Sequence, residues 1–232
     1  MKKILFLFAA FGLLAACSKS DTGPKWNDKL GSCLQNFDYQ YEKLLTKADI
    51  GKHIDIDEAT YKLEVSAMKG QYGNATYSWN SDRPDVEMEL LGHTIMTPDK
   101  NRAELTQLHF YNAKELELYS QQSVIDLFDI EYRKLSDAEV KEMRENLERE
   151  YAGDPAGLEQ AHKFLDARLD FDYKRVEQLG DRAYWTWGDY GLELNVLAGT
   201  ASFSLRTKFS ADAETTLSIT VALAKEILAK CN

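Results

Sequence analysis

The residue types that carry most enzyme chemistry are spread thinly along this chain. Its four histidines, His53, His93, His109 and His162, fall in four separate segments. His162 and Asp166 are four residues apart, so on a helix they share a face and offer a metal ion two ligands. A solvated surface pair is the more frequent outcome of this spacing. We therefore expect no metal site.

Nucleophile and cofactor motifs are also missing. No serine lies in a Gly-x-Ser-x-Gly motif, and no glycine-rich loop leads from a strand into a helix. The acidic stretch Asp55 to Glu58 lacks the glycine and distal glutamate of a calcium loop and indicates a solvated turn. We expect a non-enzymatic protein without a cofactor. A hydrolase built on a carboxylate pair is the least favoured alternative, because 38 acidic residues always include some suitably spaced pair.

One residue has a chemistry that its surroundings do indicate. Met1-Lys2-Lys3 precedes an apolar run from Ile4 to Ala16, which is shorter than the roughly 20 residues of a membrane span. The run ends in Leu14-Ala15-Ala16-Cys17 and resembles a bacterial lipoprotein signal peptide with its lipobox. The resemblance implies cleavage of residues 1–16 and lipidation of Cys17. A plain secretory signal, cut near Ala15 or Ala16, is the alternative.

The same resemblance implies a location. Ser18 follows the cysteine where an aspartate would favour retention in the inner membrane. We therefore expect an anchor in the outer membrane of a Gram-negative bacterium, with the domain facing the periplasm. Residues 17–28 are polar, contain Gly23-Pro24, and are expected to form a flexible tether.

Two further cysteines remain near the ends of the folded part, Cys33 and Cys231. Thiols outside the cytoplasm usually pair, which favours a disulfide; two free thiols are the alternative. A bridge across 198 positions would restrict the unfolded chain strongly.

Composition limits the partners. Removing the two lysines of residues 1–16 from the 28 basic residues leaves 26 against 38 acidic residues, a net charge of −12. This charge disfavours nucleic acid and anionic membrane surfaces, so attachment to the membrane must come from the lipid. A chain of this length suits a single α+β domain over residues 29–232.

Hydrophobic periodicity predicts the elements of that domain. We expect a helix over 34–45 and a short helix at 47–50 capped by Thr46. Period-two alternation predicts a hairpin over 61–79, further strands at 86–90 and 105–111, and a meander over 183–207. Ser136 and Glu139 form a capping box for a helix, a second helix follows Pro155, and a broad apolar helix closes the chain. This last helix should lie across the sheet and bring Cys231 near Cys33.

Two short segments carry a second resemblance. The residues are Cys33 ahead of Leu44-Leu45-Thr46-Lys47-Ala48-Asp49-Ile50-Gly51, and Val176-Glu177-Gln178-Leu179-Gly180-Asp181-Arg182-Ala183 before strands with a turn at Gly199. They resemble envelope lipoproteins of the PsbP/LpqN-like fold. The resemblance implies a curved antiparallel sheet with helices packed on one side, used for binding or assembly more often than for catalysis.

The aromatic residues supply the candidate binding surface. Trp185 and Trp187 share a strand face with Ala183 and are expected in the core. Tyr184 and Tyr190 are expected to be exposed, and with Asp181 and Arg182 they form the candidate surface. The expected function is a non-catalytic binding or assembly module for an envelope protein partner. The alternative is a small-molecule carrier with an aromatic-lined pocket.

Overall fold

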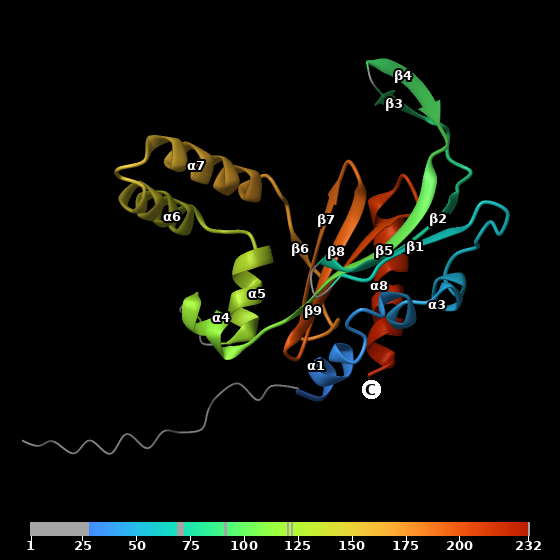
Figure 1. Ribbon diagram of the computed structural model, residues 1–232, viewed down its shortest axis with the longest axis horizontal. Helices are drawn as coiled ribbons and strands as arrows, with labels where there is room; N and C mark the ends of the chain where they lie inside the picture. The colour runs from blue at the N-terminus through green and yellow to red at the C-terminus, as the bar shows by residue number, and fades with distance from the viewer. Residues whose placement is uncertain (1–27, 69–71, 91, 120, 122, 232) are drawn as a thin grey trace, which may run out of the picture.

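The computed structural model describes residues 28–68, 72–90, 92–119, 121 and 123–231. The expected signal peptide, residues 1–16, and Cys17 lie outside these residues. An open, seven-stranded antiparallel sheet forms the centre of the molecule, in the order β1-β2-β5-β9-β8-β7-β6 (Figure 1). Its strands are β1 (Lys62–Ser66), β2 (Asn74–Asn80), β5 (Lys100–Phe110), β6 (Lys174–Arg175), β7 (Arg182–Gly188), β8 (Gly191–Ala198) and β9 (Ala201–Lys208).

The predicted strand-rich halves join into this one sheet. β1 and β2 form the expected hairpin, and β7, β8 and β9 form the expected meander. The halves meet where β5 pairs with β9, with Leu105 opposite Leu205. Alternating residues of these strands are buried on one face, because side chains alternate across the sheet with a period of two. This buried face holds the main core.

A layer of helices covers that face. The layer contains α1 (Asp28–Gln35), α2 (Tyr41–Leu44), α3 (Lys47–Gly51) and α8 (Ala213–Ala229) (Figure 1). Asp212 caps α8 by accepting from the Thr215 amide at 2.7 Å, and the buried Leu223 and Ile227 pack in the main core. The expected fold class, α+β with a C-terminal helix across an antiparallel sheet, is confirmed.

The first predicted helix is two helices. The chain leaves helical geometry between Gln35 and Tyr41, where Tyr39 has a φ of +68°. A positive φ places Tyr39 in the left-handed region of backbone conformation, which interrupts a right-handed helix. The break lets both Leu34 and Tyr41 become fully buried. By contrast, the cap predicted at Thr46 is confirmed, because Thr46 and Asp49 form a reciprocal capping box.

A disulfide joins the two ends of the described chain. Cys33 of α1 is bonded to Cys231, which follows α8, and their Cα atoms lie 5.5 Å apart. The bond connects the first helix of the domain to the last one. Both helices therefore hold the same side of the sheet.

The other face of the sheet, called here the outer face, carries α4 (Ala113–Leu118) and α5 (Val124–Tyr132) over one end. Leu127 and Phe128 of α5 pack with Tyr184 and Leu197 in a second, smaller core. Thus α5 lies outside the helical layer, on the face opposite α8.

The two longest helices of the middle section pair with each other. They are α6 (Asp137–Glu150) and α7 (Pro155–Leu169), which stand away from the sheet (Figure 1). The predicted capping box of Ser136 and Glu139 is confirmed.

One predicted strand belongs to a different sheet. β3 (Val86–Leu90) pairs with β4 (His93–Thr97) in a separate two-stranded hairpin that projects from the molecule (Figure 1). β4 was not among the predicted strands. Its alternation places Ile95 half-buried between exposed neighbours, which gives only a weak signal of period two.

Candidate functional site

The structure separates the four residues of the candidate binding surface. Tyr184 is only 6% exposed, so the expectation that it is exposed was wrong. The reason is α5, which covers the outer face of β7 at this point. The Tyr184 hydroxyl donates to Asp129 Oδ1 of α5 at 3.0 Å, and Arg182 Nε lies 3.4 Å from Asp129 Oδ2. Arg182 and Tyr184 therefore hold α5 against the sheet.

Asp181 closes a turn. Its Oδ2 accepts from the amide of Gly199 at 2.6 Å, and its own amide donates to the carbonyl of Leu197 at 2.8 Å. Tyr190 is 88% exposed, as expected, but it lies in the turn after β7, at the end opposite Arg182. A strand of this length spans about 20 Å, so these residues do not form one patch.

The two tryptophans also differ. Trp185 is 6% exposed and belongs to the main core, as predicted. Trp187 is 37% exposed, and its predicted place in the core was wrong; the pairing of β7 with the edge strand β6 covers Tyr184 and Trp185 and stops before Trp187. Together with Phe171 and Tyr190 it borders an open hollow of about 740 Å³.

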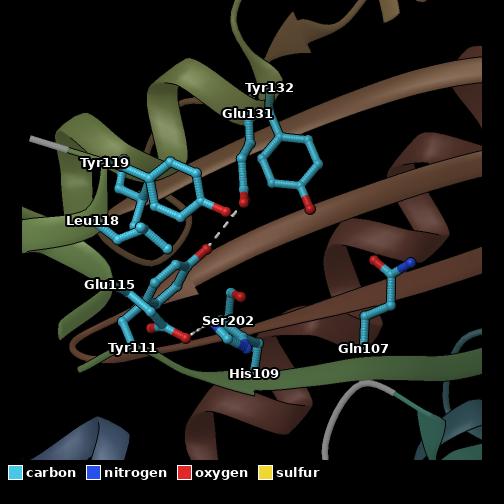
Figure 2. A pocket seen from close by; sticks show the side chains of 10 residues that line it. Gln107, His109, Tyr111, Glu115, Leu118, Tyr119, Glu131, Tyr132 and Ser202 are labelled. Atoms are coloured by element: carbon cyan, nitrogen blue, oxygen red, sulfur yellow. Dashed lines mark hydrogen bonds and ion pairs between the residues drawn. The ribbon is translucent and has the colours of Figure 1, made fainter. Parts of the chain in front are cut away.

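A second hollow is lined by tyrosines and polar side chains from several elements. It measures about 570 Å³ and lies between α4, α5 and the outer face of β5 and β9 (Figure 2). We call it the tyrosine cavity. Three tyrosines line it: Tyr111 follows β5, Tyr119 follows α4, and Tyr132 ends α5. The remaining lining residues are Gln107, His109, Glu115, Leu118, Leu127, Glu131 and Ser202.

A β-bulge in β5 turns two of these side chains toward the cavity. Ala103 and Leu105 point into the main core, yet Leu108 does so as well, which reverses the alternation. The pairing with β9 shifts register between Thr106 and His109, and Gln107 has a φ of +53°. A bulge adds one residue and moves everything after it to the other face. His109 and Tyr111 consequently reach the outer face.

Hydrogen bonds fix the floor of the cavity. The Tyr111 hydroxyl lies 3.3 Å from Glu131 Oε2, and His109 Nε2 lies 3.4 Å from Glu115 Oε1 (Figure 2). Gln107 Oε1 accepts from the Ser204 hydroxyl at 2.9 Å. These contacts join β5 and β9 of the sheet to α4 and α5.

The surroundings shift the pKa values of the cavity groups. Glu131 is partly exposed to solvent, but the protein around its carboxyl desolvates this group and raises its pKa. The hydrogen bond from Tyr111 opposes this rise in pKa. Burial raises the pKa of Tyr111 and Tyr132 above the usual range. The phenols therefore remain hydrogen-bond donors at neutral pH.

The cavity contains a serine and a histidine, the residue types of a nucleophile and its base, but each contacts a different partner. His109 and Ser202 are opposite each other on β5 and β9. The imidazole pairs with Glu115, whereas Ser202 bonds the Tyr111 phenol and lowers its pKa. A nucleophile needs a hydrogen bond to its base.

Metal binding finds no support within residues 28–231 where these are described. No group of three or more histidine, cysteine or acidic side chains there is arranged so that it could hold a metal ion. The predicted pair His162 and Asp166 is taken up by Arg144 of α6, whose guanidinium lies 3.4 Å from His162 Nδ1 and 2.5 Å from Asp166 Oδ1. It is a link between α6 and α7.

Sequence reasoning missed the tyrosine cavity. Tyr111 ends the strand predicted over 105–111, but the bulge at Gln107 that turns Tyr111 to the outer face has no glycine to mark it. The one signal was Asn112, which forms a capping box with Glu115 and thereby starts α4 directly after β5.

Comparison with protein-family models, curated proteins and solved structures gives no match for this chain. The resemblance to PsbP/LpqN-like lipoproteins therefore stays a prediction. None of the helices in the described part of the chain is long and apolar enough to cross a membrane.

Proposed function

We propose that this chain is a lipid-anchored binding protein of the cell envelope that carries a small ligand in the tyrosine cavity and performs no catalysis. The observation that carries the proposal is the cavity itself. It has a volume typical of ligand pockets, and its polar groups converge from four elements. Of the two kinds of binding that the sequence suggests, carriage of a small molecule has the better support.

The location in the proposal rests on the cysteines. Cys17 ends a lipobox-like signal, and a disulfide between Cys33 and Cys231 is typical of oxidising compartments. The acidic composition agrees with anchoring by lipid rather than by charge. We place the domain on the periplasmic side of the outer membrane of a Gram-negative bacterium.

The test is mass spectrometry of the full chain expressed in such a bacterium. We expect the mature protein to begin at an acylated Cys17, to sediment with outer membranes, and to lose both properties in Cys17→Ser. Under native conditions we expect an additional ligand mass. A chain that retains residues 1–16, or that carries no ligand when isolated from envelope extract, would contradict the proposal.

Two exposed tyrosines provide a matched comparison for the site. Tyr119→Ala removes a ring of the tyrosine cavity, whereas Tyr190→Ala removes a ring at the far end of β7. Neither side chain is buried, so both variants should fold. We expect the ligand mass to disappear in Tyr119→Ala and to persist in Tyr190→Ala.

A protein partner is the second candidate, and a specific observation favours it. Trp187, Tyr190 and Phe171 expose aromatic surface around the larger hollow, and exposed aromatic rings are frequent anchors of protein interfaces. A photo-crosslinking residue at position 190 should then capture a discrete partner in cells. The same residue at position 119 should capture that partner only if both hollows belong to one interface.

A further inference from the structure

We infer that the tyrosine cavity binds an organic cation, meaning an ammonium group carried on an apolar body. This inference rests on the proposed function, since it names the chemical class of the ligand in the same site. Three features of the lining support it: the aromatic rings, the balance of charge, and the apolar mouth.

The rings are held in place before any ligand arrives. The Tyr132 ring lies between Phe128 and Tyr173, with centroids 4.7 and 5.4 Å away. The Tyr111 ring packs edge-on against His109 at 4.5 Å. Figure 2 shows the rings of Tyr111, Tyr119 and Tyr132 around the carboxyl of Glu131. Aromatic rings that converge on a carboxylate are the usual means of holding an ammonium group.

The charge of the lining is negative. Two carboxylates, Glu115 and Glu131, line the cavity, and no lysine or arginine is among its ten lining residues. His109 is occupied by Glu115. Within the part of the chain that the structure describes, Glu131 has no ion pair. The cavity therefore lacks a cation for its central carboxylate.

Arg168 is the guanidinium whose charge acts on Glu131, and its contacts are with other groups. Its charge lowers the pKa of Glu131, as does that of His109, while Glu115 raises it. However, Arg168 donates to the carbonyl of Arg133 at 2.7 Å and lies over the Tyr173 ring at 5.3 Å. It supports the back of α5 and leaves the cavity free for a ligand.

The mouth of the cavity is apolar. Leu118 is 74% exposed and Tyr119 is 57% exposed, and α4 has no buried residue. A ligand with an apolar body would cover these side chains and remove their surface from water. A bare metal ion or a simple ammonium ion would leave most of the 570 Å³ empty.

Binding should also depend on pH in a defined direction. Desolvation raises the pKa of Glu131 in the empty protein, and a bound ammonium group favours the ionised carboxylate. The cation should therefore bind more tightly as the pH rises through this pKa. Below it, binding should release a proton.

The experiment is calorimetric titration of the full lipidated chain in non-ionic detergent with three ligands of one shape. They are 2-phenylethylammonium, 2-phenylethanol and 3-phenylpropanoate, which are cationic, neutral and anionic. We expect the cation to bind at least about tenfold more tightly than the alcohol, and the anion not to bind.

Two substitutions of glutamate by glutamine assign the effect to the cavity. Glu131→Gln should weaken binding of the cation about tenfold and remove the proton release. Glu117→Gln makes the same change in net charge on α4, outside the lining, and should leave the affinity unchanged. Tyr119→Ala should weaken binding of both cation and alcohol.

The outcomes separate this inference from the proposed function. Equal affinity for cation and alcohol, or no effect of Glu131→Gln, would overturn the cation and leave the cavity as a binding site. An anionic or neutral ligand in the native mass spectrum would also overturn the cation and leave the cavity as a binding site. Absence of binding by all three probes, with no ligand mass in the native protein, would overturn both.

Discussion

Lys230 Nζ lies 2.6 Å from Asp49 Oδ2, which joins two residues 181 positions apart at the end of α8 and within α3. The same ammonium group donates to the carbonyls of Lys43 and Leu44 at 3.0 and 2.9 Å. All three of its hydrogens are thus used. One lysine near the end of the chain holds the beginning of the fold.

This contact predicts how stability depends on pH. Burial of Asp49 acts to raise its pKa, but Lys230 and Thr46 outweigh burial and lower the pKa to about 2. Because the pKa of Asp49 is lower in the folded state than in the unfolded chain, where it is near 4, ionised Asp49 stabilises the fold above pH 4. This stabilisation is lost as the pH falls from 4 toward 2. We expect about 2 kcal/mol to be lost over this window. Urea unfolding across pH 2 to 6 measures it.

Lys230→Met should remove most of this stabilisation, because it takes away the closer of the two ammonium groups at a largely buried carboxylate and leaves only Lys52, 3.4 Å from Asp49 Oδ1. Lys225→Met, on the exposed side of the same helix, is the control and should change stability little. An unchanged pH profile in Lys230→Met would show that the pair contributes nothing.

The disulfide makes a prediction about reduction. Cys33 and Cys231 enclose almost the whole domain, and the loop-entropy model gives roughly 5 kcal/mol as an upper value for such a loop. We expect reductant to lower the melting temperature of the native chain strongly. The double variant Cys33→Ser/Cys231→Ser should have the melting temperature of the reduced native chain, and reductant should not change it. A change in that variant would point to another thiol.

The bulge in β5 makes a prediction about Gln107. A β-branched residue is strained at its φ of +53°, so Gln107→Val should destabilise the fold by about 1–2 kcal/mol. Gln107→Gly suits the backbone but loses the bond from Ser204 and should cost less than valine. Chemical unfolding compares the three proteins. Equal stability of the valine and glycine variants would mean that the backbone carries no strain.

The hydrogen bond at the Asp181 turn predicts that two aspartates differ in their contribution to stability. Asp181→Ala leaves the Gly199 amide without its acceptor and should lower the free energy of unfolding by about 1 kcal/mol. Asp189 lies exposed in the next turn, and Asp189→Ala should be neutral. A loss of stability that is equal in both variants would argue against a specific role for the contact with Gly199.

Local periodicity was sufficient for most elements of the fold. The hairpin over 61–79, the meander over 183–207 and the closing helix are each governed by near neighbours in sequence, because alternation and capping act within a few residues. Contacts between distant residues were harder to predict. Tyr184 becomes buried only because α5, more than 50 residues earlier, lies on the outer face of β7.

The sequence by itself was enough to predict the α+β class and to show that catalytic motifs are scarce, and it supplies the whole basis for expecting a lipid anchor at Cys17, since composition and short-range patterns carry that information. The tertiary structure alone decided where a ligand would lie. Tyr111, Tyr119 and Tyr132 line one cavity because a bulge at Gln107 reverses the faces of β5 and because α4 and α5 fold back over the sheet. A register shift of one residue moves every later side chain to the other face of the sheet. This shift is visible only in the pairing of β5 with β9.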